Sequence, residues 1–469
     1  MKIDSASFLP RRSGGVRHRP EADIGSIREL LRGGYGTARS ILKELIQNAE
    51  DADASRMDVY WIPGDSASPL SLLAHPSLIV SNNGRFTEEN RDAITQMSLG
   101  TKGTEERAIG RFGKGLKSIF AWSEAFFIIA RTDLKLGWPE DRIVDFFNPW
   151  HGWRHGDWDG QFDRHSDLLV GEIERLLCTN HFPAENLWLA FWLPLRQDCK
   201  ENQEWILKSF PGNDPEFCKN LAIDTRYLVP SLGSLRNLQQ IKINVDPFNV
   251  QDSLVLEFPD QSERIPPPDT TPGTINPVTG EIHLGASNNR RTAYRYSGFA
   301  GRLPDESVAS LKTASDWPKV VSRTSGQTSA SCPVKGEPHF ATMITSHPPT
   351  DEGSSGNLDV RWCVFFPVGK QPQDTLPLNL VGICRNITIN LHGFFFLDSE
   401  RLRIDGLEET FNPNGPTVGK TCLKWNEVIA TDGTLARLPG ALATFGQNES
   451  LTHTQCLELV GAPQYKALG

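Results

Sequence analysis

Three polar side chains stand at helical spacing in the segment KELIQNAEDAD, residues 43–53. Glu44, Asn48 and Asp51 fall at i, i+4 and i+7, which places them on one face of a helix. A carboxylate one turn from a carboxamide can position a water molecule and hold Mg²⁺, which prefers oxygen ligands and keeps several of its waters. Glu44 beside such an ion can act as the general base that activates water. Alone, a polar stripe of this kind is more often a solvated helix face.

Glycines gather in a second segment, GRFGKGLKS, residues 110–118. Gly110, Gly113 and Gly115 let the backbone approach a ligand closely, and a helix that follows them offers free N–H groups to an anion. The pattern suits a phosphate cradle, although a single glycine-rich loop is more often structural. The preceding segment, residues 99–104, is polar and interrupted by glycines, as in a lid that closes over a ligand.

The elements that must position these residues are predicted from hydrophobic spacing. Apolar residues on the face opposite Glu44 and Asn48 predict a helix within residues 24–54, interrupted at Gly33–Gly34. Further elements are expected in this half of the chain as strands at 57–62, 77–80 and 188–195, and as a helix at 87–97. The second of these strands leads into Asn82-Asn83-Gly84, a turn signal.

The second half of the chain alternates strands with polar stretches. Strands are expected within 225–260 and at 362–366 and 387–397, loops at 261–280 and 310–356, and helices at 420–430 and 434–445. We therefore expect a flexible arm at 1–20, a first domain at 21–200, a second domain at 201–410 with polar insertions at 261–280 and 310–356, and a C-terminal helical segment at 411–469.

Composition narrows the class of protein. The chain has 469 residues and a net charge of −9, enough length for roughly two to four domains. The acidic balance argues against a general nucleic-acid binder. There is no apolar run long enough to span a membrane and no secretory signal at the start, so we expect neither a membrane protein nor a secreted one. The 8 cysteines are scattered singly, which favours a reducing, cytoplasmic environment over a zinc site or disulfides.

In order along the chain, the motifs resemble the GHKL (Bergerat-fold) superfamily of ATPases, in particular its sacsin-type and MORC-type, heat-shock-ninety-like branches. KELIQNAEDADA is similar to the N-box, LIVSNNGRFTEENRDAI to the G1 segment, and SLGTKG with IGRFGKGLKS to the lid and the G2 box. This resemblance covers roughly residues 24–200. It continues more weakly through FWLPLR, 191–196, and INLHGFFFLDSERLRI, 389–404.

The resemblance implies an α+β fold: a Bergerat ATPase domain with a mixed sheet and helices on one face, followed by a smaller α/β domain of the transducer or middle type. It also implies an ATP-binding, Mg²⁺-dependent, ATP-hydrolysing conformational machine whose lid closure is coupled to the second domain. A nucleotide-dependent homodimer and a protein client or partner would accompany such a machine. The alternative is a nucleotide-gated binding module with little or no hydrolysis.

Residue by residue, the resemblance assigns Glu44 as general base and Asn48 as Mg²⁺ ligand. Lys102 matches a lid lysine, and Arg401 corresponds to a basic residue that reaches the γ-phosphate from the second domain. The implied nucleotide contacts are Asn48, Asp51, Asn82, Asn83, Lys102, Gly110, Phe112, Gly113, Lys114, Gly115 and Ser118.

Two departures from the family concern the base. The superfamily places an Asp in G1 that accepts a hydrogen bond from the adenine amino group. This chain has Asn82 there, or Asn83 if the alignment shifts by one residue. Leu189 stands where a Thr usually precedes the closing strand, and leucine donates no hydrogen bond. Base specificity is therefore open.

Other classes fit less well. The segment Gly415–Thr421 resembles a P-loop but has one spacer too few, contains a proline and follows no clear strand. A histidine kinase needs a phospho-acceptor helix upstream of the N-box, where only a short polar arm stands. A DNA-processing ATPase is disfavoured by the acidic balance, and a fold without nucleotide is the remaining alternative. The biological role, whether chaperone, phage defence or remodelling, is not encoded in these motifs.

Overall fold

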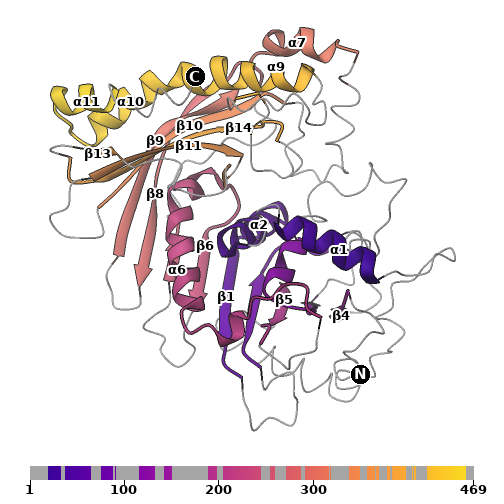
Figure 1. Ribbon diagram of the computed structural model, residues 1–469. Coiled ribbons are helices and arrows are strands. Elements are labelled where there is room, and N and C mark those ends of the chain that lie inside the picture. The colour runs from indigo at the N-terminus through magenta and orange to yellow at the C-terminus, as the bar shows by residue number, and fades with distance from the viewer. Residues whose placement is uncertain are drawn as a thin grey trace. The chain divides into compact units, whose positions relative to one another are not determined.

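The computed structural model describes residues 20–32, 37–64, 75–87, 90, 116–131, 142–149, 188–197, 204–244, 254–258, 271–286, 291–315, 317, 337–348, 356–364, 366–368, 378–380, 383–397, 404, 406–407 and 420–460 (Figure 1). The chain forms two compact units. The first comprises Met1–Thr225, Asn237–Val255 and Ala286–Asn288, and the second comprises Arg226–Arg236, Leu256–Gly285 and Asn289–Gly469.

The first unit contains a mixed sheet. Its strands are β1 (Arg56–Ile62), β2 (Ser77–Asn82), β3 (Phe126–Arg131), β4 (Arg142–Phe147), β5 (Trp188–Pro194) and β6 (Gln240–Asn244). β6 runs parallel to β1, and the order then continues through β2, β5, β3 and β4 with antiparallel neighbours. All residues of β2 and β5 are buried, as expected of strands covered on both faces.

Helices α1 (Pro20–Leu30) and α2 (Ala38–Asp51) lie together against these strands (Figure 1). The side chain of Thr37 caps α2 by accepting a hydrogen bond from the backbone N–H of Ser40. The apolar residues predicted to face the core are buried, namely Ile41, Leu42, Leu45, Ile46 and Ala49. Both helices contact the short 3-10 helix η3 (Lys117–Ala121), and α2 also contacts β1. Farther along the unit are η5 (Pro211–Asn213) and α6 (Phe217–Leu228).

The second unit is built on antiparallel strands with one parallel pair. β8 (Ile275–Ala286), β9 (Arg291–Arg302), β10 (His339–His347) and β14 (Asn386–Gly393) pair antiparallel in that order. β11 (Gly356–Val364) runs parallel to β14 and pairs with β12 (Phe366–Pro367) and β13 (Leu378–Leu380). β7 (Leu254–Glu257) lies at the boundary between the units.

Helices cover one face of these strands (Figure 1). They are α9 (Lys420–Val428), the π-helical η9 (Ile429–Leu435), α10 (Ala436–Asn448) and α11 (His453–Val460), with α7 (Asp305–Lys312) beside α9. Leu442 and Phe445 of α10 pack into a cluster with Ile344, Ile389 and Leu391 of the strands. The short 3-10 segment η6 (Val229–Ser234) also belongs to this unit and contacts β10 and β14.

The α+β class with a mixed sheet is confirmed. Two ranges expected as loops contain strands: β8 begins at Ile275, and β10 occupies 339–347. Pairing with β9 explains both, because tertiary hydrogen bonds outweigh the proline and serine content of the flanking sequence. The expected C-terminal helices are present, and they belong to the second compact unit. No helix among the described residues is long and apolar enough to cross a membrane.

Candidate functional site

The polar face of α2 is buried. Glu44 is 4% exposed and Asn48 is 6% exposed, whereas Asp51, one turn later, is partly exposed. A solvated helix face is therefore wrong for the first two residues. The Nδ2 atom of Asn48 is inaccessible to solvent and has no hydrogen-bond partner among the described residues. Such a buried, unmatched amide is uncommon in folded proteins and calls for a physical explanation.

The end of α2 packs directly on the turn that follows β2. The backbone N–H of Arg85 donates to the carbonyl of Ala52 at 2.8 Å. A Cβ atom on Gly84 would lie 2.7 Å from the Cβ of Ala52, so only glycine fits between the helix and the turn. The N-box helix and the Asn-Asn-Gly turn, which are separate motifs in the sequence, thus meet at one place.

The two asparagines of this turn have different surroundings. Asn83 is used on both sides of its amide: Oδ1 accepts the backbone N–H groups of Ser55 and Arg56, and Nδ2 donates to the Ser55 hydroxyl. These hydrogen bonds stabilise the connection between α2 and β1. Asn82 is 4% exposed, and its Oδ1 accepts the Gly84 backbone N–H at 2.9 Å. Asn82, not Asn83, therefore has an amide group left for a ligand.

The two departures from the family lie next to one another. Asn82 on β2 is the register partner of Leu189 on β5. The sequence separates them by more than a hundred residues, but the antiparallel pairing places both side chains on the same face of the sheet.

Arg56 and Asp58 form an ion pair that belongs to the other face of this sheet. The Arg56 Nε atom donates to Asp58 Oδ2 at 2.6 Å, and Asp58 is fully buried. Burial raises the pKa of Asp58, against the opposing effect of the Arg56 charge. Asp58 is in register with Ser81, the neighbour of Asn82, so strand alternation keeps it away from the Asn82 side.

A further acidic residue of α2 has a structural role that the sequence does not reveal. Glu50 is 6% exposed, and its carboxylate accepts the backbone N–H groups of Asn237 and Leu238 at 3.0–3.1 Å. Asn237 in turn donates from its side chain to the Glu50 carbonyl. Glu50 thus ties the last turn of α2 to the segment that enters β6.

Ser118 lies on η3, fully buried and close to α2 through the contact between the two helices. The helix expected after the glycine segment is a 3-10 helix of 5 residues in the structure. Lys102, Gly110, Phe112, Gly113, Lys114, Gly115 and Arg401 lie outside the described residues.

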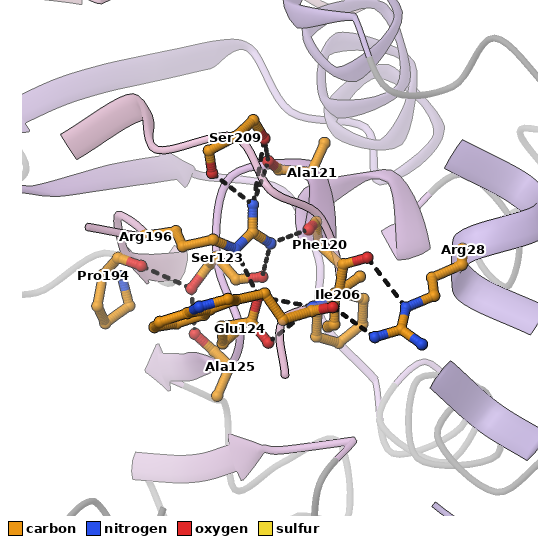
Figure 2. A network of polar contacts seen from close by, with 11 residues as sticks. Arg28, Phe120, Ala121, Ser123, Glu124, Ala125, Pro194, Arg196, Ile206 and Ser209 are labelled. Atoms are coloured by element: carbon orange, nitrogen blue, oxygen red, sulfur yellow. Dashed lines mark hydrogen bonds and ion pairs between the residues drawn. The ribbon is translucent and has the colours of Figure 1, made fainter. Parts of the chain in front are cut away.

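A buried arginine holds the C-terminal end of η3 (Figure 2). The Arg196 guanidinium donates to the carbonyls of Phe120 at 2.6 Å, Ala121 at 3.0 Å and Ser123 at 3.3 Å. Its Nε atom pairs with Glu124 at 2.5 Å. Burial lowers the pKa of Arg196, while the charge and hydrogen bond of Glu124 act in the opposite direction.

The same network reaches α1 (Figure 2). Glu124 accepts the backbone N–H of Ile206 at 3.1 Å, and Arg28 of α1 donates to the carbonyls of Trp205 and Ile206. Because η3 carries Ser118, this network fixes the position of a residue that the resemblance assigns to the nucleotide. FWLPLR is visible in the sequence as a motif, but nothing in it indicates which carbonyls Arg196 binds.

Comparisons with known proteins agree with these motifs. Residues 23–242 match the family model of the Sacsin domain. Sacsin of Homo sapiens is 30% identical over 185 residues, which is 37% of this chain and 4% of that protein. The chain therefore matches only a small part of its relative's length. The B-subunit of the DNA gyrase from Myxococcus xanthus aligns over 83% of this chain and 89% of its own at 12% identity, with a TM-score of 0.32, too low to carry an argument.

The end of α2 packs on the NNG turn beside a mixed sheet, which brings together two of the motifs that carry the resemblance. The family match makes residues 23–242 similar to the Sacsin domain, and it supports the resemblance of the motifs to a GHKL-type, sacsin-like ATPase.

Proposed function

We propose that the first unit binds a nucleoside triphosphate with Mg²⁺ and hydrolyses it, ATP being the nucleotide that the resemblance implies. The observation that carries this proposal is the burial of Glu44 and Asn48 on one face of α2, with the Asn48 Nδ2 atom unmatched among the described residues. Leaving a polar group buried without a partner costs about 1–3 kcal/mol, which a bound ligand can offset.

The residues present fit a magnesium nucleotide. The Asn48 carboxamide supplies an oxygen of the kind that Mg²⁺ accepts, and turning the amide exchanges which of its two ends faces the ligand. No group of three or more His, Cys, Asp or Glu side chains is assembled for a metal within the described residues, so the phosphates would supply most of the remaining ligands. When bound, the ion neutralises charge on the phosphates.

In the proposed reaction, Glu44 accepts a proton from water as the water oxygen bonds to the γ-phosphorus and the bond to the leaving oxygen breaks. Asn48 would hold the Mg²⁺ ion, which would neutralise charge on the phosphates. Ser118, which the Arg196 network holds in place through η3, would contact the phosphates together with Gly110, Gly113 and Gly115.

The test compares two glutamates of one helix. Glu44→Gln removes the base, whereas Glu50→Gln alters a carboxylate of similar burial that binds backbone N–H groups. We expect Glu44→Gln to bind nucleotide but to lose turnover by about 10²–10⁴-fold. Glu50→Gln should lower thermal stability and keep turnover per folded molecule. Binding is followed by calorimetry and turnover by phosphate release.

The outcomes separate the two functional classes. If wild type and Glu44→Gln both bind nucleotide and neither hydrolyses it, the domain is a nucleotide-gated binding module. If wild type binds no nucleotide, the proposal fails. Equal loss of turnover in both variants would mean that Glu44 acts through the fold and not through the reaction.

Lid closure and assembly extend the same proposal. Lys102 in the lid segment and Arg401 in the second unit would meet the phosphates in the closed, nucleotide-bound state, and that state would pair two copies of the chain. Analytical ultracentrifugation with and without a non-hydrolysable analogue tests the pairing, and an unchanged sedimentation coefficient would contradict it. A protein client or partner belongs to the same proposal.

A further inference from the structure

We propose that the segment Arg226–Arg236 couples the nucleotide site to the second unit: nucleotide bound at α2 slows the detachment of this segment from β10 and β14. We call the segment the strap, and it contains η6. The inference rests on the proposed function, because the nucleotide is the ligand that acts on α2. It adds a route through described residues to the lid closure that the resemblance implies.

The chain crosses the boundary between the two units at each end of the strap. Thr225 belongs to the first unit, Arg226–Arg236 to the second, and Asn237 again to the first. The backbone therefore connects the strap to the first unit at both of its ends, although its middle packs against strands of the second. A connection at both ends limits how far the strap can move while its flanking residues stay fixed.

The residues that flank the strap are bound by the two ends of α2. Near the start of the helix, Arg39 donates from Nη2 and Nε to one carboxylate oxygen of Asp224, at 2.8 Å and 3.2 Å. Near its end, the Glu50 carboxylate accepts the backbone N–H of Asn237 at 3.0 Å. The proposed base and metal ligand lie between these two anchors on the same helix. A ligand that fixes α2 therefore also fixes both ends of the strap.

The middle of the strap is held by hydrogen bonds from strands of the second unit. The Pro230 carbonyl accepts Asn390 Nδ2 at 2.8 Å and the Thr345 hydroxyl at 2.9 Å. Arg361 donates to the Tyr227 carbonyl at 2.9 Å, and its guanidinium lies 4.0 Å from the centroid of the Tyr227 ring. Such bonds have narrow limits of distance and angle, so the strap is either docked or open, with few positions in between.

The affinity of the nucleotide for these two states gives the direction of the effect. A ligand shifts an equilibrium only by as much as its affinities for the two states differ. Opening of the strap lets its flanks move, which loosens the anchors of α2 and holds Glu44 and Asn48 less precisely, so the nucleotide binds the docked form more tightly. The structure shows the docked form, and while that form is the major species, the affinity of the folded chain is the affinity of the docked form.

The experiment measures amide hydrogen exchange of the full chain by mass spectrometry, with and without Mg²⁺ and a saturating non-hydrolysable ATP analogue. In wild type we expect the analogue to slow exchange in the strap at least about tenfold and to leave β8 of the second unit unchanged. The double variant Arg39→Ala, Glu50→Gln weakens both anchors. On binding the analogue it should still show slower exchange in α2, but it should lose most of the slowing in the strap.

Lys219→Ala on α6 is the control variant. It removes an exposed ion pair with Glu216 and keeps both anchors, so it should behave as wild type. Binding of the analogue by calorimetry with unchanged exchange in the strap would overturn the inference and leave the proposed function standing. Equal slowing in the strap and in β8 would overturn it too, because the nucleotide would then act on global unfolding.

The variants give the remaining outcomes. The inference is wrong if the double variant keeps the wild-type slowing in the strap, or if Lys219→Ala loses it. If wild type binds no nucleotide, the proposed function and the inference fail together.

Discussion

Buried asparagines occur both on α2 of the first unit and next to η6 of the second, and the two differ in their hydrogen bonds among the described residues. There, Asn390 donates from Nδ2 to the Pro230 carbonyl at 2.8 Å, and its Oδ1 lies 3.0 Å from the Ser231 hydroxyl. Thr345 donates to the same carbonyl at 2.9 Å. On α2, Asn48 is also buried, yet its Nδ2 atom has no partner in the described part of the chain.

The difference separates two uses of a buried polar group. A matched group holds backbone segments together, and its removal leaves its partners unsatisfied. An unmatched group has no hydrogen bond among the described residues to offset its desolvation, and at Asn48 this supports the proposed ligand. Asn390 and Asn48 are both buried amides; the hydrogen bonds of the first stabilise the fold, and the second is the one that we propose binds a ligand.

The largest expected loss of stability concerns Asn390, the buried asparagine whose amide is hydrogen-bonded at both ends. Asn390→Leu removes both ends of the amide and leaves the Ser231 hydroxyl short of a partner, so we expect the free energy of unfolding to fall by about 3 kcal/mol. Urea unfolding checks it. Nucleotide affinity should be unchanged at temperatures where the variant is folded. A variant as stable as wild type would mean that these bonds contribute little.

The variant Asn48→Ala removes the buried asparagine whose Nδ2 atom has no partner among the described residues. Its unfolding free energy should change by less than about 1 kcal/mol, because no bond among the described residues is lost from Nδ2. Its affinity for the magnesium nucleotide should fall about a hundredfold, equivalent to about 2.7 kcal/mol. The two quantities are measured on one preparation by urea unfolding and calorimetry. A destabilisation as large as that of Asn390→Leu would remove the distinction between the two sites.

A third prediction concerns the protonation of the buried His392 and its effect on stability at low pH. Burial, with Arg236 and His339 nearby, lowers the pKa of His392 on β14 to about 3. The folded state therefore holds this ring neutral, while the unfolded chain protonates it near its ordinary pKa of about 6.5. Its contribution is present above that pKa and is lost as the pH falls from about 6.5 toward 3, about 2 kcal/mol by pH 5.

Unfolding in urea at pH 7.5 and pH 5 measures this loss. His392→Phe should flatten the pH dependence but not abolish it, because burial also lowers the pKa of His347. An unchanged slope in the variant would show that the pKa of His392 is the same in the folded and unfolded states, contrary to the prediction.

The sequence predicts individual helices and strands better than it predicts contacts between residues that are far apart in the chain. Apolar spacing predicts α2, β1, β2 and β5 because periodicity reflects the layer against which each element packs. Spacing places Glu44 and Asn48 on one helix face, the resemblance gives them their expected roles, and their burial is seen only in the structure. By contrast, Glu50 binds a partner 187 residues away and Arg196 one 72 residues away. No local pattern marks such pairs.

Strand β10 shows a different limit. It lies inside a range rich in Ser, Thr, Gly and Pro, and that composition suggests a loop. Two of its buried polar residues have a backbone partner on another element: Thr342 donates to the Thr434 carbonyl, and Thr345 to that of Pro230. Composition predicts exposure only when such partners are absent.

The smallest expected effect concerns the hydrogen bonds that Thr342 and Thr345 donate to backbone carbonyls. Both are fully buried on β10, on opposite faces, and each donates to one carbonyl that has a second donor. Thr342→Val and Thr345→Val should each lower the unfolding free energy by about 1 kcal/mol. Combined with Asn390→Leu, Thr345→Val should cost about 1 kcal/mol more than the sum, because the Pro230 carbonyl then loses both side-chain donors. Thr342→Val should add to Asn390→Leu without coupling. Equal coupling in both double variants would mean that the effect spreads through β10 itself and not through the shared carbonyl.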